Sequence, residues 1–295
     1  MSAAAPLALV HGRFGWEEKA LVRRAGELGF ELQVVSEREL ALGAVRPAGG
    51  RLAQGAPVLL RCPSFFRSTV AAAALAAAGH PVLNRHEVLA LAGEKAKSDL
   101  WLRRSGLPTL PSLVLLSLDR LDAVRETLGF PLVVKPNVGG FGRLVQRLDD
   151  EDDLRHAWEY LQSFAPASHR LLYLQRLVDV AHDVRLLVLD GELLAAIERV
   201  APGTLVKNVE RGAQAVPWPT GHREHQLAAA IGGRLPGAFL GIDLLIDRDG
   251  ARWVGEINAV PRFRAAAEMS GADVAGRLLT HLATLDAAEP RRRFA

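Results

Sequence analysis

The sequence is poor in cysteine, in long apolar runs and in clustered basic residues. Cys62 is the single cysteine among 295 residues, so no internal disulfide can form and we expect a reducing compartment. We interpret Cys62 as a small buried residue rather than as a nucleophile. No run of 18 uncharged apolar residues occurs, so we expect no membrane-spanning helix. The first ten residues carry no basic segment and no cleavage-like sequence, which predicts a cytoplasmic protein.

The charge of the chain argues against a nucleic-acid partner. The net charge is +3, from 36 Lys and Arg against 33 Asp and Glu. The only basic run, Arg291 to Arg293, lies in the tail, whereas nucleic-acid-binding proteins gather basic residues on one surface with aromatic ones. With 49% hydrophobic and 23% charged residues, the composition is that of a globular protein. We therefore expect small anionic substrates, no nucleic acid and no membrane; association of identical chains stays open.

The first ninety residues alternate apolar runs with helical segments. We predict strands at 6–10, 30–35, 56–60 and 81–83, and helices at 16–28 and 70–78. Strands that alternate with helices form a parallel sheet, and such sheets bind ligands at the carboxyl ends of their strands. His11, Arg13 and Arg61 fall at such ends. An exposed loop residue is the alternative for each of the three.

The rest of the chain predicts a mixture of helices and shorter strands. Helices are expected at 86–105, 118–128, 150–163 and 274–285, and strands at 112–116, 132–135, 144–146, 172–174, 183–189, 193–199, 239–247 and 252–257. Asp190-Gly191 and Asp249-Gly250 are typical of hairpin turns. The predicted fold class is α/β and α+β, with an N-terminal parallel α/β domain at 1–90. A central subdomain at 91–170, a C-terminal subdomain at 171–285 and a tail at 286–295 would follow.

Three oxygen-bearing side chains near the end of the chain predict a metal site. A hairpin around Asp249-Gly250 would bring Asp243 close to Glu256 and Asn258. Glu256 and Asn258 are two residues apart, so their side chains share one face of a strand. Carboxylate and amide oxygens suit Mg²⁺. Solvated surface acids are the alternative, which the apolar neighbours disfavour because a buried carboxylate needs a cation or a donor.

A lysine followed by glycines forms the second candidate site. The strand ending at Lys135 runs into a turn that contains Gly139, Gly140, Gly142 and Arg143. Glycines allow backbone N–H groups to approach phosphate oxygens, and a lysine supplies a point charge. The segment lacks the G-K-[ST] of a Walker loop and the G-x-G-x-x-G of a dinucleotide fingerprint. A plain hairpin turn is therefore an equal alternative for this segment on its own.

Taken in order, these segments resemble the ATP-grasp superfamily and, within it, the RimK-like α-L-glutamate ligases. The resemblance spans nearly the whole chain, to about residue 282. Its motifs are Glu94-Lys95 at a helix start, Lys135 with its glycine turn, Gln175, Asp183-Val184-Arg185, K-N-V-E-R-G-A from Lys207, and G-I-D with E-I-N-A-V-P from Gly241 and Glu256.

The resemblance implies an ATP-grasp fold and a role for each candidate residue. Lys95 and Lys135 would contact the ATP phosphates, beneath a lid formed by Gly139, Gly140, Gly142 and Arg143. Gln175, Arg176, Leu177 and Val178 would hold adenine, with Asp183 near the ribose. Asp243, Glu256 and Asn258 would ligate one or two Mg²⁺ ions, with Mn²⁺ as an alternative metal. Arg185, Asn208 and Arg211 would be the catalytic residues, facing the γ-phosphate, and Arg61 would bind the acceptor substrate.

The implied activity is an ATP-dependent carboxylate–amine ligase that acts through an acyl-phosphate. It would add L-glutamate to a carboxylate acceptor, which could be a pterin-like cofactor, a peptide or a carrier protein. Segments 261–264 and 269–273 resemble the branch associated with tetrahydromethanopterin-type cofactors. Arg176 and Gly140 depart from the acid and the serine that relatives often carry. Two alternatives are a non-catalytic ATP-binding regulatory or scaffold protein, which should lose the metal residues, and an NAD(P)-linked oxidoreductase, which should have the glycine fingerprint.

Overall fold

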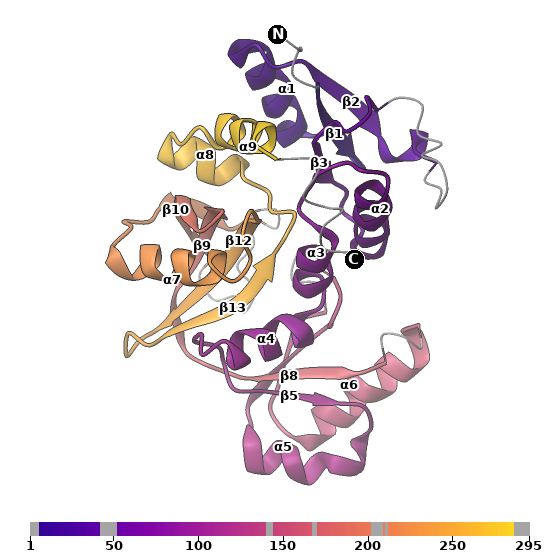
Figure 1. Ribbon diagram of the computed structural model, residues 1–295. Helices are drawn as coiled ribbons and strands as arrows, with labels where there is room; N and C mark the ends of the chain where they lie inside the picture. The colour runs from indigo at the N-terminus through magenta and orange to yellow at the C-terminus, as the bar shows by residue number, and fades with distance from the viewer. Residues whose placement is uncertain are drawn as a thin grey trace.

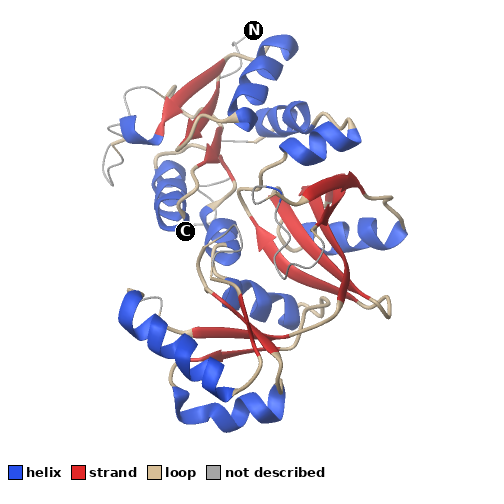
Figure 2. Cartoon of the chain, turned by 180° about the vertical axis from the view of Figure 1, so that it is seen from behind, coloured by secondary structure: helices blue, strands red, loops and turns tan. Residues whose placement is uncertain are grey.

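Three β-sheets, each with its own helices, organise the described part of the chain (Figure 1). The computed structural model describes residues 6–41, 52–139, 144–166, 170–201, 209 and 212–285. Seen from behind, the sheets follow one another through the molecule with helices between them (Figure 2). The expected combination of a parallel N-terminal sheet with antiparallel sheets is confirmed.

The N-terminal sheet has the strand order β2-β1-β3-β4 and is parallel throughout. Its strands are β1 (Leu7–His11), β2 (Leu32–Ser36), β3 (Val58–Arg61) and β4 (Val82–Leu83), accompanied by α1 (Trp16–Leu28), η1 (Glu37–Glu39), α2 (Phe65–Ala77) and α3 (His86–Ala92). The middle of β1 is fully buried, because helices cover both faces of a parallel sheet. The carboxyl ends of β1 and β3 therefore meet at one edge, with His11 opposite Arg61.

The single helix predicted at 86–105 is wrong. The chain instead forms α3 and a second helix, α4 (Lys95–Arg104), with a break at Gly93. A Cβ atom at Gly93 would lie 1.8 Å from the ring of Phe65, so α3 is packed too closely against α2 for a larger residue. The new helix is capped from a distant segment, because Asn137 accepts the backbone N–H of Ala96 at 2.9 Å through its side chain.

The central sheet has the order β5-β8-β6-β7 and is antiparallel. It consists of β5 (Ser112–Leu115), β6 (Leu132–Lys135), β7 (Gln146–Leu148) and β8 (Leu172–Arg176), with η2 (Leu118–Arg120), α5 (Leu121–Thr127) and α6 (Glu151–Phe164). Leu132, Leu154 and Leu172 are fully buried in its core. Since β8 pairs within this sheet, the change of sheet comes after Arg176 rather than at the expected boundary of residue 170.

The C-terminal sheet is antiparallel with the order β11-β10-β9-β12-β13. Its strands are β9 (Val180–Leu189), β10 (Glu192–Val200), β11 (Gln214–Pro217), β12 (Phe239–Asp247) and β13 (Arg252–Asn258), and its helices are α7 (His222–Gly232), α8 (Arg264–Ser270) and α9 (Val274–Ala283). The sequence did not predict β11, α7 or α8. The hairpin at Asp190-Gly191 is confirmed, with φ of 48° and 81°, the positive angles that a type I′ turn requires.

Helices cover one face of the C-terminal sheet and only half of the other. Val184 and Leu186 pack with Ile231 of α7 on the first face. On the second face, Leu187 and Phe239 pack in the cluster that contains residues of α8 and α9. The rest of that second face, toward α4, carries charged side chains instead of apolar ones. This uncovered half of the sheet is where the candidate site lies.

A buried asparagine fastens the N-terminal domain to the C-terminal sheet. Asn84 follows β4; its Nδ2 donates to the carbonyl oxygens of Phe239 and Ala259 at 2.7 and 2.6 Å, and its Oδ1 accepts the N–H of Phe239 at 2.7 Å. Phe239 begins β12, and Ala259 directly follows β13. The two strands that carry the expected metal ligands are therefore fixed to the domain that carries Arg61.

Candidate active site

A cleft of about 1400 Å³ is lined by residues of all three parts of the described chain. The N-terminal domain contributes Arg61, the central sheet contributes Lys135, and the C-terminal sheet contributes Asp243 and Glu256. Residues more than 180 positions apart in the sequence therefore face one space. Most of the site residues expected from the sequence that the structure describes line this cleft.

Strand register brings the three expected metal ligands onto one face. Asp243 of β12 lies opposite Glu256 of β13, and Gly241 lies opposite Asn258. Directly opposed residues point to the same side of a sheet, as do residues two apart on one strand. A bulge at Gly255 shifts the register between Asp243 and Leu244. Asp243 and Glu256 form the residue pair directly beside that bulge.

Two arginines, one on the adjacent strand β9 and one on β10 beyond it, hold the carboxylate of Asp243. Arg185 of β9 forms a two-pronged ion pair with Asp243, through Nε to Oδ1 and through Nη2 to Oδ2 at 3.1 Å. Arg199 of β10 reaches the same carboxylate, with Nη2 3.0 Å from Oδ2. Burial favours the neutral acid, but the two guanidinium groups outweigh it and lower the pKa of Asp243. The carboxylate is therefore held ionised in the cleft.

Arg199 also binds the second buried acid of this face, Asp183. Its Nε lies 3.1 Å from Asp183 Oδ1. Burial and the nearby charge of Asp243 raise the pKa of Asp183 even though Arg199 opposes the shift. Asp183 lines the cleft as expected for a residue near the ribose, but Arg199 already occupies one of its oxygens. Arg199 was not among the residues expected at the site; its only signal in the sequence is its place on a strand two residues after the buried Ile197.

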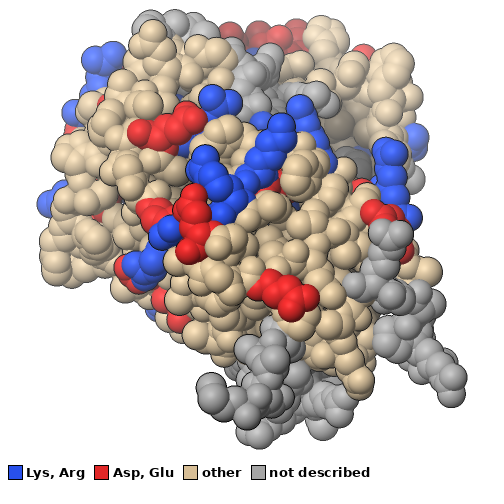
Figure 3. All heavy atoms as spheres, turned by 90° about the horizontal axis from the view of Figure 1, so that it is seen from above, with Lys and Arg blue, Asp and Glu red and all other residues tan. Residues whose placement is uncertain are grey.

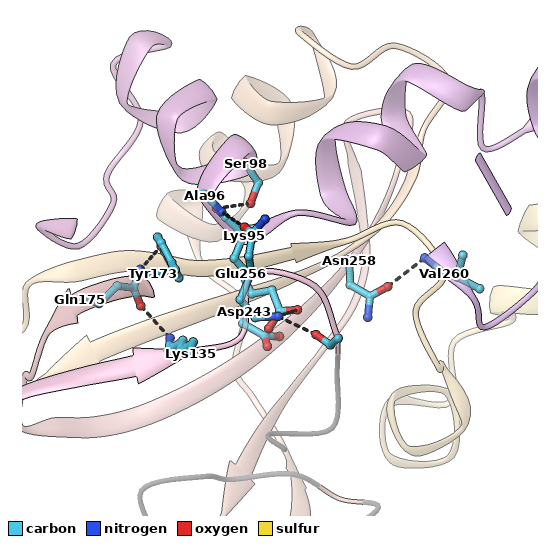
Figure 4. A network of polar contacts seen from close by, with 12 residues as sticks. Lys95, Ala96, Ser98, Lys135, Tyr173, Gln175, Asp243, Glu256, Asn258 and Val260 are labelled. Carbon is cyan, nitrogen blue, oxygen red and sulfur yellow. Dashed lines mark hydrogen bonds and ion pairs between the residues drawn. The ribbon is translucent and has the colours of Figure 1, made fainter. Parts of the chain in front are cut away.

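The donor set of this face fits a hard divalent cation. Among the described residues, no group of three or more His, Cys, Asp or Glu side chains could hold a metal, and Asp243 and Glu256 are two carboxylates on neighbouring strands that suit Mg²⁺. The side chain of Glu256 is 30% exposed and has an ion pair with Lys95 at 3.5 Å, which leaves acceptor capacity on its carboxylate. Asn258 Oδ1 accepts the N–H of Val260 at 2.9 Å and points away from the acids (Figure 4).

Two lysines from different elements meet the acids in the cleft. Lys95, the first residue of α4, donates to the carbonyl oxygen of Gly139 at 2.6 Å and pairs with Glu256. Lys135, the last residue of β6, donates to Gln175 Oε1 at 2.7 Å (Figure 4). Burial lowers the pKa of Lys135, and the charge of Lys95 adds to that effect while Glu256 opposes it. Two lysines that face one cleft are suited to a polyanionic ligand.

The expected adenine segment follows the end of the central sheet. Gln175 is 1% exposed, and its side chain is turned toward Lys135. Arg176, Leu177 and Val178 all line the cleft. The backbone N–H of Arg176 donates to the carbonyl of Pro111 at 2.9 Å. The side chain of Gln175 is thus already bonded within the protein, and the segment after it runs along the cleft.

Arg61 lies at the cleft and is held both by Glu18 of its own domain and by the segment that follows β13. Its Nε donates to Glu18 Oε1 at 2.7 Å, its Nη1 donates to the carbonyl of Pro261 at 3.3 Å, and it lies 5.4 Å from the ring centroid of Phe263. Burial opposes ionisation of Glu18, but Arg61 outweighs it and lowers the pKa of that acid. The guanidinium is therefore positioned by three partners at the carboxyl end of β3, where the sequence placed it.

Several expected site residues cannot be placed. Gly140, Gly142, Arg143, Asn208 and Arg211 lie outside the described residues, and Gly139 is the last described residue before the expected lid. Gly139 lines the cleft and has a φ of 123°, a value that L-residues rarely adopt. The side chain just before this turn was not singled out in the sequence: Asn137, which caps α4.

Other features of the described chain agree with a ligand cleft rather than with a different kind of site. Burial raises the pKa of the Cys62 thiol, so it is a poor nucleophile. No helix in the described part of the chain is long and apolar enough to cross a membrane. On the face seen from above, Lys and Arg lie in a short band with Asp and Glu beside it, not in a continuous basic stripe (Figure 3).

Comparison with known proteins identifies the class. Residues 92–282 match the RimK-like ATP-grasp domain, and residues 7–91 match the LysX preATP-grasp domain. A RimK domain ATP-grasp protein from Sphaerobacter thermophilus superposes with a TM-score of 0.78 at 24% identity, covering 94% of this chain and 99% of that one. The D-alanine–D-alanine ligase of Bacillus anthracis, solved with ATP, superposes with a TM-score of 0.70 at 18% identity. The match covers 99% of this chain and 100% of that one. These two likenesses concern the fold.

Sequence relatives point to ligases that act on amino acids. The alpha-aminoadipate–LysW ligase LysX of Saccharolobus solfataricus is 28% identical over 269 residues, which is 90% of this chain and 96% of that protein. The glutamate–LysW ligase ArgX of Sulfolobus acidocaldarius is 24% identical over 268 residues, which is 90% of this chain and 94% of that protein. The coenzyme gamma-F420-2:alpha-L-glutamate ligase of Methanococcus maripaludis is 26% identical over 194 residues, which is 62% of this chain and 64% of that protein.

The fold and the charged cleft are those of an ATP-grasp protein. The chain belongs to the RimK-like ATP-grasp family and is an ATP-dependent, ADP-forming carbon–nitrogen ligase. The alternative of a non-catalytic ATP-binding scaffold finds no support, and both acids that a degenerate member should have lost are present and face the cleft. The family uses ATP, generally with Mg²⁺.

Proposed function

We propose that this ligase activates a carboxylate as an acyl-phosphate and joins it to the amino group of L-glutamate or a closely related acidic amino acid. The observation that carries the proposal is the convergence of Lys95, Lys135, Asp243 and Glu256 on one cleft that Arg61 also lines. Cations for a polyphosphate, acids for a metal and an arginine for a second anion thus share one space. Such a set suits phosphoryl transfer between two bound anions.

The first step is the attack of a carboxylate oxygen on the γ-phosphorus of ATP. A P–O bond forms, the bond to the β-phosphate oxygen breaks, and ADP leaves. Lys95 and Lys135 would bind phosphate oxygens and reduce the repulsion between the two anions. Asp243, Glu256 and Asn258 would hold the magnesium ion, which supplies further neutralisation of the phosphate charge. Arg185, which pairs with Asp243 here, would lie beside the transferred phosphoryl group.

The second step is the attack of the amine on the carbonyl carbon of the acyl-phosphate. The C–N bond forms, the C–O bond to phosphate breaks, and the amine nitrogen gives up a proton as phosphate leaves. Water would compete with the amine for this intermediate, so the cleft has to be closed during the step. The turn that begins at Gly139 is the segment we propose for the lid. Asn208 and Arg211 keep their expected roles beside the acyl-phosphate as part of this proposal.

The acceptor is proposed to be a carboxylate on a carrier protein or peptide. LysX and ArgX, whose names give LysW as a substrate, align with this chain over at least 94% of their own length. The F420 cofactor ligase aligns over 64% of its length, so the extended resemblance favours a carrier over a pterin-like cofactor. Arg61 is proposed to contact the acceptor carboxylate from the N-terminal side.

ADP release in the presence of hydroxylamine tests the proposal. The protein is incubated with ATP, Mg²⁺ and hydroxylamine together with one carboxylate at a time: small dicarboxylic acids, peptides that end in glutamate, and a purified LysW-type carrier. The expected result is ADP and hydroxamate with peptide or carrier, and amide when L-glutamate replaces hydroxylamine. If no carboxylate raises ADP release above background, the acyl-phosphate mechanism fails. If only the small dicarboxylic acids are active, the carrier assignment fails.

A further inference from the structure

A chain of buried hydrogen bonds runs from Lys135 into the central sheet. Lys135 Nζ donates to Gln175 Oε1 at 2.7 Å, and Gln175 Nε2 donates to Tyr173 Oη at 2.5 Å (Figure 4). Gln175 and Tyr173 are each 1% exposed. Because solvent barely reaches these side chains, each polar group depends on its neighbour for a hydrogen bond.

The chemistry of the groups fixes the direction of the chain. An ammonium group has only donors, so Gln175 must present its oxygen to Lys135 and its NH₂ to Tyr173. The phenol oxygen of Tyr173 accepts that bond, and Ser112 lies beside the hydroxyl, where it opposes the rise that burial causes in the pKa of Tyr173. Ser112 Oγ in turn donates to the carboxylate of Asp99, which also accepts from Thr109 Oγ1. The chain therefore begins at a cation and ends at a buried anion, the arrangement in which successive bonds strengthen one another.

The far end of this chain lies on the helix that begins with the other cleft lysine. Asp99 is on α4, four residues after Lys95, and residues four apart lie on one face of a helix. Lys95 is thus part of α4 itself, whereas Lys135 is hydrogen-bonded through Gln175 to Tyr173, which lies next to Ser112, the partner of Asp99. Lys95 repels the ammonium group of Lys135, whereas Glu256, Asp243 and Asp183 attract it, so the hydrogen bond to Gln175 selects one position among several that these charges would allow.

We propose that Tyr173 is a positioning residue for ATP binding, because it orients Gln175 and thereby holds Lys135 toward the phosphates. Helix α4, through Asp99, then sets the spacing between the two lysines before nucleotide arrives. The proposal rests on the phosphate-binding role proposed above for Lys135. It assigns a function to a tyrosine that does not itself line the cleft.

Tyr173→Phe tests this directly, because it keeps the buried ring and removes only the hydroxyl. The amide of Gln175 loses its acceptor and can rotate its NH₂ toward Lys135. The protein offers a matched control in Tyr160→Phe, since Tyr160 is the only other tyrosine and is 49% exposed on α6. The affinities for ATP, ADP and adenosine are measured by calorimetry on the full chain, and KM for ATP and kcat are measured separately.

Tyr173→Phe should weaken the binding of ATP and of ADP about tenfold, as expected when the charge-assisted hydrogen bond between Lys135 and Gln175 is no longer oriented. Adenosine affinity should be unchanged, kcat should change less than the KM for ATP, and Tyr160→Phe should match the parent protein. Unchanged ATP affinity, or an equal loss for adenosine, would overturn the proposal. If Tyr173→Phe does not fold, Ser112→Ala breaks the chain one bond further on and is judged by the same criteria. Normal ATP affinity in Lys135→Met would instead remove the phosphate role of the lysine itself.

Discussion

Arg199 Nη2 lies 3.0 Å from Asp243 Oδ2, and this contact joins the two buried acids of the cleft, since Arg199 Nε also lies 3.1 Å from Asp183 Oδ1. The side chains of Arg199 and Asp183 are 9% and 10% exposed. A buried charge that loses its partner is costly, because water cannot replace the lost contact. Arg199 is therefore the side chain that allows a ribose candidate and a metal candidate to lie side by side.

Arg199→Met should destabilise the protein by about 3 kcal/mol, because two carboxylates would lose their shared cation. Activity should fall as well, since Asp243 would no longer be held in place. Urea unfolding at neutral pH and ADP release at saturating ATP measure the two effects. Arg248→Met is the matched control, because the Arg248–Asp179 pair is exposed at 74% and 71% and such pairs contribute little. Equal effects of the two variants would contradict the bridging role of Arg199.

Glu256→Gln should lower kcat by at least about 100-fold, because the amide keeps the size of the side chain and removes the negative charge that a metal requires. Stability should hardly change, since the side chain is 30% exposed. Titration with Mn²⁺ in the presence of ATP should show weaker metal binding by the same variant. Glu192→Gln, in an ion pair whose partners are about half exposed, should behave like the parent. Undiminished turnover would remove Glu256 from the proposed metal site.

Glu18→Gln should destabilise the protein by about 3 kcal/mol at pH 7, because Arg61 would stay buried without its counter-ion. The sign of the pH dependence follows from the pKa of Glu18, which Arg61 holds below the ordinary value of 4.5 against the effect of burial. The pair stabilises the fold above pH 4.5, and this contribution is lost as the pH falls through the lowered pKa. Unfolding free energies at pH 7, 5 and 3.5 should show the gap between parent and variant closing only below pH 4.5. A constant gap would mean that the ion pair does not stabilise the fold.

Gly232→Ala should lower stability by about 2 kcal/mol or more, because a Cβ there would lie 2.1 Å from the Cα of Gly191 and α7 would have to move off the β9–β10 turn. Gly26→Ala is the control: Gly26 is in α1, and a Cβ there would meet nothing within 4 Å. That variant should gain about 0.5–1 kcal/mol from helix propensity. Thermal unfolding of Gly232→Ala and Gly26→Ala measures both effects. If Gly232→Ala is stabilised, the β9–β10 turn can move away from α7 at little cost.

The sequence predicted the elements whose signal is local. The apolar run at 239–247 and the helix at 16–28 match β12 and α1 at both ends, because strand and helix periodicities are written in neighbouring residues. The helix at 86–105 was wrong because its break depends on Phe65, which comes from another helix. Strand β11 and helix α8 were missed because each is short, and their burial comes from packing on distant residues.

Some contacts of the candidate site could likewise be predicted from local sequence, and others could not. The sequence predicted that a hairpin would bring Asp243 close to Glu256, but their direct pairing depends on the bulge at Gly255, which shifts the register between Asp243 and Leu244. Arg199 could not be connected to Asp243, because β10 and β12 meet only through β9 and the strand order of this sheet is not a local property. The link between Tyr173 and Lys135 likewise needs the pairing of β6 with β8.

The sequence by itself determined which strands and turns would form and which side chains could bind phosphate or metal. Only the tertiary structure decided which buried charge meets which, as in Arg199 with Asp183 and Asp243, or Arg61 with Glu18. The physical reason is the distance along the chain over which each effect acts. Turn geometry and side-chain periodicity act over a few residues, whereas a buried ion pair exists only once packing has excluded water from groups far apart in the chain.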